Sequence, residues 1–242
     1  MRARHVAARR ARARGVGRRT SLGGVTSLVY AERPAAGEAR GLLVLHHGRG
    51  TDELDLLPLA DELDPQRTLH VVAPRGPLQI SGWPGNHWYL VPRVGYPDAG
   101  TFASSYVALA QLHDELWERT GTGPERTVLG GFSMGCVMSY ALGLGSGRPA
   151  PAAILALSGF IPTVDGWRDD AASRGAVRVL ISHGRLDPVI SVDFARRARA
   201  LLEESGLDVG YHEFDGAHHL DPNYTTATRA WIDEVGDGFA PV

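Results

Sequence analysis

A serine inside a turn bounded by glycines is the first feature of this sequence that could do chemistry. Residues 131–135 read Gly-Phe-Ser-Met-Gly, with Ser133 at the centre. An aliphatic segment precedes this G-x-S-x-G pattern and a helical pattern follows it, and this strand–turn–helix context exposes a serine as a nucleophile. The glycines leave room for a sharp turn, and the helix N-terminus favours negative charge that develops beside it. We predict that Ser133 is a nucleophile; the alternative is a glycine-rich turn with an incidental serine.

A nucleophilic serine needs a base, and the base needs an acid that orients it. In the chain order Ser, acid, His that accompanies this turn, Asp187 stands in the segment His-Gly-Arg-Leu-Asp-Pro after an aliphatic run. Asp165, Asp193 or a merely structural turn aspartate are the alternatives. Two histidines, His218 and His219, follow the last aliphatic run. Adjacent residues in a turn point in different directions, so we expect only one of them to reach the serine.

Acyl transfer also requires backbone N–H groups that stabilise a negatively charged oxygen. The residue after the nucleophile, Met134, is expected to supply one donor. Residues 46–52 read His-His-Gly-Arg-Gly-Thr-Asp directly after an aliphatic run, and their glycines let the backbone approach closely. We predict that the Arg49 amide is the second donor. A strand-to-helix turn capped by Asp52 is the alternative, and the two interpretations are compatible.

Short aliphatic segments alternate with helical patterns from about residue 25 onward. Apolar residues at spacings of three and four predict a helix over 102–116, and another helix is expected to begin near Ser191 as its N-cap. The segment 75–100 is rich in Gly, Pro and aromatic residues and predicts a long surface loop. The alternation predicts an α/β fold with a mostly parallel central sheet and helices on both faces. The predicted strands are residues 42–45, 69–73, 127–129, 153–157, 177–181 and 209–214.

The composition is that of one soluble globular domain. Hydrophobic residues make up 43% and charged residues 21% of the 242 residues, and the net charge is −2, which argues against a disordered or fibrous protein. No apolar run approaches the roughly 20 residues of a membrane-spanning helix, and the single Cys136 cannot form an intramolecular disulfide. We therefore expect a cytoplasmic protein without stable membrane insertion or a nucleic-acid partner; a homodimer is left open.

Residues 1–24 are basic and are predicted to lie outside the folded domain of residues 25–242. This leader lacks the apolar segment of about 7–15 residues that a secretory signal needs. A short charge run is usually solvated, so we predict a disordered tail; a mis-assigned start and a contact arm for an anionic surface are the alternatives. The histidines and the cysteine show no spacing typical of a metal site, and we expect neither a metal nor a cofactor.

Motifs of a known family appear in order along the chain: His47-Gly-Arg-Gly, Ala73-Pro-Arg-Gly-Pro, Gly130-Gly-Phe-Ser-Met-Gly, Leu157-Ser-Gly-Phe-Ile-Pro, His183-Gly-Arg-Leu-Asp-Pro-Val and Gly216-Ala-His-His. This succession, over about residues 40–236, resembles the phospholipase/carboxylesterase family of α/β-hydrolases, which includes acyl-protein thioesterases. The resemblance implies an α/β-hydrolase fold without a large cap domain. It also selects His219 as the base, because in that family the catalytic histidine stands three residues after the glycine of its turn. Many relatives have Gln where Met134 stands, which makes the pocket here less polar.

The resulting hypothesis is a serine carboxylesterase that acts on small to medium carboxylic esters through an acyl-enzyme intermediate, with Ser133, Asp187 and His219 as its catalytic residues. A lysophospholipase or acyl-thioesterase preferring long acyl chains is the rival enzyme, and a hydrolase scaffold retained as a non-catalytic binding module is the rival of another class. Without a cap, the site is expected to be open. Its pocket is predicted to be lined by aromatic and apolar side chains, with simple packing beneath the long loop as the alternative: Trp83, Trp88, Tyr89, Phe160 and Ile161.

Overall fold

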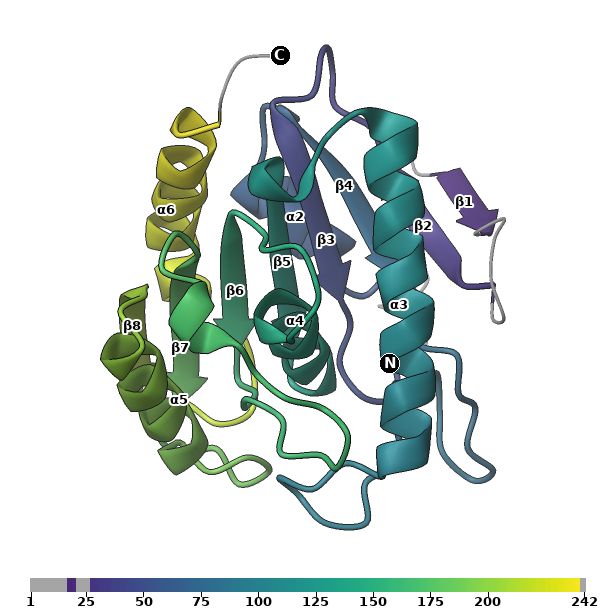
Figure 1. Ribbon diagram of the computed structural model, residues 1–242, viewed down its shortest axis with the longest axis vertical. Helices are drawn as coiled ribbons and strands as arrows, with labels where there is room; N and C mark the ends of the chain where they lie inside the picture. Colours follow the sequence, from purple (N-terminus) through teal and green to yellow (C-terminus); the bar gives the residue numbers. More distant parts are fainter. Residues whose placement is uncertain (1–16, 21–26, 240–242) are drawn as a thin grey trace, which may run out of the picture.

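A computed structural model describes residues 17–20 and 27–239 of the chain. These residues form an eight-stranded sheet in the order β1-β2-β4-β3-β5-β6-β7-β8 (Figure 1). The strands from β4 to β8 in this order run parallel to one another. They contain the six predicted strands: β3 (Gly41–His46), β4 (Leu69–Pro74), β5 (Thr127–Phe132), β6 (Ala153–Leu157), β7 (Arg178–Gly184) and β8 (Asp208–Phe214).

Two antiparallel strands extend the sheet at the β4 edge. The strand β2 (Val29–Arg33) pairs with β4, and β1 (Gly17–Thr20) pairs with β2. The prediction of a leader outside the fold is therefore wrong for residues 17–20, while residues 1–16 and 21–24 lie outside the described residues. Buried carboxylates explain why this short basic strand docks: the Arg18 guanidinium lies 2.8 Å from the carboxylate of the buried Glu53, and Arg19 pairs with the buried Glu32.

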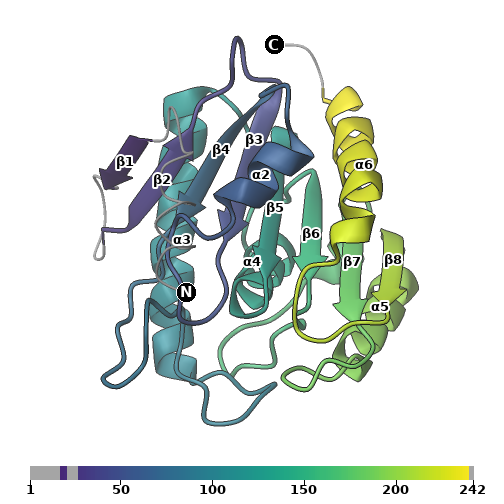
Figure 2. The same ribbon diagram turned by 180° about the vertical axis from the view of Figure 1, so that it is seen from behind.

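Helices cover both faces of the sheet, as the alternating pattern predicts. Figure 1 shows α3 (Ala99–Thr120), α4 (Met134–Leu144) and α5 (Asp193–Glu204) in front of the strands. Figure 2, seen from behind, shows α2 (Leu57–Leu63) and α6 (Thr225–Asp237) on the other face. The strands between the two layers are aliphatic and buried on both sides; every residue of β3 and of β6 is buried. This burial is the reason why parallel strands of this kind read as continuous apolar runs rather than as alternating patterns.

Local capping sets the ends of the helices. The Asp98 carboxylate accepts a hydrogen bond from the Thr101 backbone N–H at 2.9 Å and caps α3, and Gly121 in a left-handed conformation ends the same helix. The helix α5 begins at Asp193 with Val192 as its N-cap, so the prediction of Ser191 at that position is wrong. The Ser191 hydroxyl still accepts a hydrogen bond from the Asp193 N–H, at 3.3 Å.

The connections leave the carboxyl edge of the sheet without a cap domain. Between β6 and β7 the chain forms only the short 3₁₀ turn η2 (Ala171–Ser173). The predicted long loop lies between β4 and α3 and contains only isolated bridges, such as that between Leu78 and His87. Within the residues that the structure describes, no helix is long and apolar enough to cross a membrane.

Candidate active site

Ser133 lies at a strained turn between β5 and α4. Its φ of 55° and ψ of −118° are unusual for a residue other than glycine. The Ser133 N–H donates to the Leu157 carbonyl at the end of β6, at 2.9 Å, which anchors the turn to the neighbouring strand. A Cβ atom at Gly131 would collide with the backbone of Gly135, so the close approach of strand and helix requires glycine there.

A row of three side chains begins at this serine. The Ser133 Oγ atom lies 2.8 Å from Nε2 of His218, and Nδ1 of His218 lies 2.6 Å from Oδ2 of Asp187. An ionised carboxylate only accepts hydrogen bonds, so Nδ1–H donates to Asp187 and Nε2 is free to accept from the serine hydroxyl. This tautomer can take the serine proton as the hydroxyl attacks a carbonyl.

The choice of His219 from the family resemblance is wrong in this geometry. His219 is exposed and its ring packs edge-on against Phe214, with ring centroids 5.3 Å apart. His218, which follows Gly216 by two residues rather than three, occupies the place between Ser133 and Asp187. The ring of Phe132, the residue before the nucleophile, packs on the His218 ring at a centroid distance of 4.9 Å.

Contacts between two loops explain which histidine faces the serine. The Arg185 N–H donates to the Phe214 carbonyl at 2.8 Å, and the Leu186 N–H donates to the Gly216 carbonyl at 2.9 Å. These bonds join the loop after β7, which carries the acid, to the loop after β8, which carries both histidines. Gly184 also lies against the carbonyl of Gly216, where a Cβ atom would collide. The register of these hydrogen bonds directs His218 towards Asp187.

The acid is held by a further set of donors. Oδ1 of Asp187 accepts from the backbone N–H groups of Val189 at 2.8 Å and Ile190 at 2.9 Å. The buried His183 has Nε2 at 2.9 Å from the Ile190 carbonyl and at 3.3 Å from Oδ2 of Asp187. Burial lowers the pKa of His183 and so favours a neutral ring. Nε2–H therefore donates into this loop, a role that the sequence analysis did not assign to His183.

Neither alternative acid, Asp165 or Asp193, takes the position beside the histidine. Asp193 instead opens α5 and pairs with Arg196 at 3.2 Å. Among the residues that the structure describes, no group of three or more His, Cys, Asp or Glu side chains is arranged to hold a metal ion. Cys136 is buried in α4, and burial raises the pKa of its thiol, which keeps the sulfur protonated.

The loop after β3 packs against the start of α4, where Met134 follows the nucleophile. A Cβ atom at Gly135 would collide with the carbonyl oxygen of His46, so the loop backbone lies directly on the first turn of the helix. The loop is fixed by His47: its Nδ1 lies 2.7 Å from the Gly48 carbonyl, and its Nε2 accepts from the Gly76 N–H at 2.9 Å. Burial lowers the pKa of His47 to about 4 and keeps Nε2 available as an acceptor at neutral pH.

The predicted pocket residues are mostly core residues. Trp88, Tyr89 and Phe160 are buried in the core between the sheet and helices α3 and α4, and Ile161 is partly buried. The indole N–H of Trp88 donates to the His47 carbonyl at 2.9 Å, and its backbone N–H points at the Met134 sulfur at 3.3 Å. Trp88 therefore supports the loop after β3 and the turn at Ser133. The prediction that Trp88 and Tyr89 line an open pocket is wrong, because the long loop folds these two side chains into the core.

Trp83 is the exception among these aromatic residues. Its side chain is 54% exposed, and the Arg49 guanidinium stacks on its ring at 3.9 Å from the centroid. This cation–π contact ties the tip of the long loop to the loop after β3. The Arg49 side chain thus has a structural partner at the surface, and its backbone N–H follows the His46 and His47 backbone that packs against α4.

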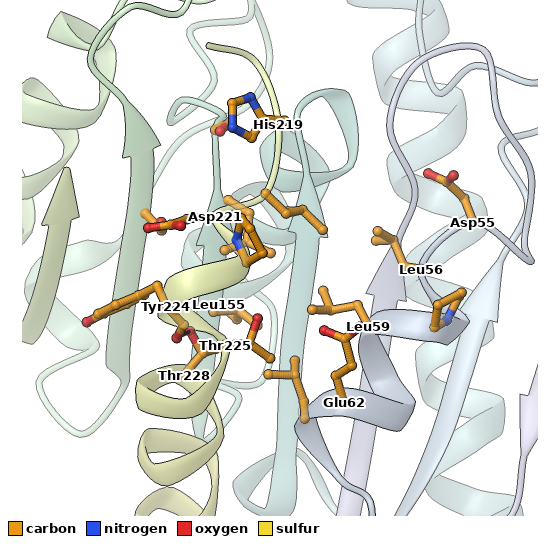
Figure 3. A pocket seen from close by; sticks show the side chains of 17 residues that line it. Asp55, Leu56, Leu59, Glu62, Leu155, His219, Asp221, Tyr224, Thr225 and Thr228 are labelled. Atoms are coloured by element: carbon orange, nitrogen blue, oxygen red, sulfur yellow. Dashed lines mark hydrogen bonds between the residues drawn. The ribbon is translucent and has the colours of Figure 1, made fainter. Parts of the chain in front are cut away.

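A cavity of about 240 Å³ lies on the other face of the sheet, between α2 and α6 (Figure 3). None of the five predicted pocket residues lines it. Its wall contains leucines from α2 and β6, and Figure 3 shows His219 at one end. His219, the exposed neighbour of His218, therefore faces this cavity.

The fold and the hydrogen-bonded side chains of Ser133, His218 and Asp187 define an α/β-hydrolase. The sequence profile of the Phospholipase/Carboxylesterase family matches residues 32–234, and the chain belongs to this family of esterase and thioesterase hydrolases. The acyl-protein thioesterase 1 of Yarrowia lipolytica is 26% identical over 77% of this chain and 87% of its own length.

Solved structures share this fold. The carboxylesterase of Bacillus cereus superposes with a TM-score of 0.74 at 23% identity, covering 86% of this chain and 94% of that one. The esterase PE8 has a TM-score of 0.71 at 29% identity, covering 84% of this chain and 97% of that one. The expected α/β-hydrolase fold without a large cap domain is confirmed.

Proposed function

We propose that this hydrolase is a serine carboxylesterase that cleaves small to medium carboxylic esters through an acyl-enzyme intermediate. The observation that carries the proposal is the position of His218, within hydrogen-bond distance of both Ser133 Oγ and Asp187 Oδ2. A binding module would have no use for a buried carboxylate that orients a histidine towards a strained serine.

In the first step, Nε2 of His218 removes the hydroxyl proton while Ser133 Oγ attacks the ester carbonyl carbon. The resulting imidazolium is stabilised by Asp187, whose second oxygen is already held by two backbone N–H groups. Collapse of the tetrahedral intermediate breaks the bond to the alcohol, and His218 gives its proton to the departing oxygen. In the second step, water loses a proton to His218 and attacks the acyl-enzyme, which releases the acid and restores Ser133.

The negative oxygen of each tetrahedral intermediate needs donors on the side of the serine away from His218. We assign this role to the backbone N–H groups of Met134 and Arg49. The packing of the His46 and His47 backbone onto Gly135 in the first turn of α4 supports the assignment, because it brings the loop after β3 beside the N-terminus of the helix. Helix N-termini favour developing negative charge, and loss of one donor of this kind typically costs about 3–4 kcal/mol.

The test is hydrolysis of p-nitrophenyl esters from acetate to palmitate by the wild-type protein and by Ser133→Ala. We expect turnover of short and medium chains and a loss of about 10³-fold or more in the variant, because the nucleophile is gone. Ser139→Ala is the matched control, since Ser139 lies on the same helix and its hydroxyl bonds His46 and Gly135 rather than the triad. Equal activity of wild type and Ser133→Ala would contradict the proposal.

Acyl-thioester hydrolysis is the second candidate, and the names of several relatives favour it. Proteins called acyl-protein thioesterase 1 from Yarrowia lipolytica and Gibberella zeae match most of this chain at 26% and 25% identity. The same triad would serve either reaction. Parallel kcat/KM series on acyl esters and acyl thioesters of equal chain length decide between the two: preference for long-chain thioesters would replace the carboxylesterase assignment.

A further inference from the structure

We propose that the cavity between α2 and α6 binds the aliphatic chain of the ester's alcohol, that is, the leaving group. This inference rests on the proposed serine esterase activity and adds a binding site for one half of the substrate. Leucines make up much of the wall (Figure 3). They are Leu56, Leu59, Leu63, Leu155, Leu157 and Leu220.

The order of the strands assigns a side to each half of the substrate. The loop after β3, with the proposed donor Arg49, lies on one side of β5, and the loops after β7 and β8, with the acid and the histidine, lie on the other. His218 must give its proton to the departing oxygen, so the alcohol leaves on the histidine side of Ser133. The next residue, His219, stands at the end of the cavity. The chain of the alcohol therefore points towards this end of the cavity.

A direct backbone link joins the cavity to the nucleophile. Leu157, whose carbonyl accepts from the Ser133 N–H at 2.9 Å, also lines the cavity, as does the following residue, Ser158. Ser158 is buried and has a positive φ of 51°. Such a conformation is costly for serine and is found where the surrounding structure fixes the chain. The end of β6 thus both supports the turn at Ser133 and lines the cavity.

The charges of the lining select the ligand. Asp55, Glu62 and Asp221 are among the lining residues, and none of the lining residues is lysine or arginine. The Asp221 carboxylate pairs with His212 at 2.8 Å and so remains ionised beside the cavity. A carboxylate or phosphate would meet negative charge there. The cavity therefore suits a neutral alkyl chain and disfavours an anionic one.

The size of the cavity limits the length of the chain. An apolar cavity of about 150 Å³ holds a six-carbon ring, so a volume of about 240 Å³ leaves room for a chain of about eight carbon atoms. Full burial of a methylene is worth about a fourfold change in an equilibrium or rate constant. In a cavity that is open at one end, we expect about two- to threefold per methylene.

The experiment compares two ester series with Leu59→Trp, which fills the cavity from α2. In the first series the acid is acetate and the alcohol grows from ethyl to dodecyl; in the second the alcohol is ethyl and the acid grows. For the wild type, kcat/KM should rise about two- to threefold per carbon up to about octyl in the alcohol series. Leu59→Trp should flatten this rise while leaving the slope of the acid series in place. Val107→Trp, on the exposed surface of α3 at the other face, is the control and should keep both slopes.

Three further measurements complete the design. Leu59→Ala enlarges the cavity and should move the optimum to longer alcohols by one or two carbons, which tests the site even if the tryptophan variant does not fold. 1-Octanol should inhibit competitively and more strongly than 1-propanol, with a smaller difference between the two in Leu59→Trp. An acetate ester whose octyl chain ends in a carboxylate should react at least tenfold more slowly than the plain octyl ester.

The two proposals fail in different ways. Absence of Ser133-dependent turnover on any ester would remove the proposed function itself. Two outcomes with Ser133-dependent turnover would overturn only the alcohol site. In one, kcat/KM does not rise along the alcohol series; in the other, it rises equally in the wild type and in Leu59→Trp. A rise confined to the acid series that Leu59→Trp abolishes would also overturn it, because the cavity would then hold the acyl chain.

Discussion

The two faces of the sheet are completed differently beside the same catalytic edge. On the α3–α4 face, the loop between β4 and α3 inserts Trp88 into the core, where its indole N–H supports the carbonyl of His47 at 2.9 Å. On the α2–α6 face, a cavity of about 240 Å³ reaches His219. Beside the catalytic loops, the α3–α4 face therefore supplies a buried side chain that supports them, and the α2–α6 face leaves a cavity.

The lengths of the helices account for this difference. The helix α3 has 22 residues, an Asp98 side-chain cap and a glycine at its C-terminus, whereas α2 has seven residues and no side-chain cap. Seven residues span only about 10 Å, so α2 cannot cover the strands as α3 does. Its end is fixed instead by the Asp64 carboxylate, which pairs with the buried Arg33 at 2.7 Å. A short, firmly anchored helix leaves a gap that a longer helix would close.

The largest expected effect separates the adjacent histidines that face these two regions. His218→Ala should lower kcat/KM for p-nitrophenyl acetate by about 10³-fold or more, because the base is lost. His219→Ala should lower it by no more than about tenfold, since its ring contacts Phe214 and the cavity instead of Ser133. Steady-state kinetics with both variants measures the ratio. A greater loss for His219→Ala would reverse the assignment made from the geometry.

The next effect compares the packing of the two faces. Trp88→Ala should reduce the free energy of unfolding by about 3–5 kcal/mol, because a fully buried ring is removed from a filled core. Leu59→Ala should cost about 1 kcal/mol, because this partly exposed side chain already borders empty space. Urea unfolding curves give both values. Equal costs would mean that the α2–α6 face is as tightly packed as the other one.

A third effect concerns pH and the buried histidines of the α3–α4 face. Burial lowers the pKa of His113 to about 3 and that of His47 to about 4. The unfolded chain therefore binds more protons than the folded one once the pH falls below about 6.5. Above that pH the contribution of these histidines to the free energy of unfolding is fully present. It is lost as the pH falls towards 4, by about 1.4 kcal/mol per pH unit for each histidine.

Unfolding by urea at several pH values between 7.5 and 4.5 measures this slope. The variant His113→Gln removes one of the titrating rings and should flatten the slope by about one proton. His212→Gln, a partly exposed ring at the α6 side, is the matched control from the other face. An unchanged slope in His113→Gln would show that this histidine does not contribute to acid unfolding. Glu32 contributes to the slope only at the lower end of this range, because its pKa is lowered from 4.5 to about 2 and its contribution is lost between these two values.

Much of the fold follows from local sequence patterns. The six parallel strands are predicted by short aliphatic runs, and the stripe of apolar residues predicts α3, because these periodicities depend on neighbours along the chain. The strand β1 could not be predicted in this way. Its four residues are exposed and two of them are basic, and they join the sheet because Arg18 and Arg19 meet the carboxylates of Glu53 and Glu32, which are distant in sequence.

The sequence by itself determined the nucleophile turn and the acid, since the backbone around Ser133 and Asp187 is set by glycines and turn residues within a few positions. Only the tertiary structure decided between His218 and His219. Their ring directions depend on how the loop after β8 is joined to the loop after β7 by the Arg185 and Leu186 N–H groups. The inward position of Trp88 and the cavity beside α2 were likewise decided in three dimensions, because both depend on how much space the helices leave above the sheet.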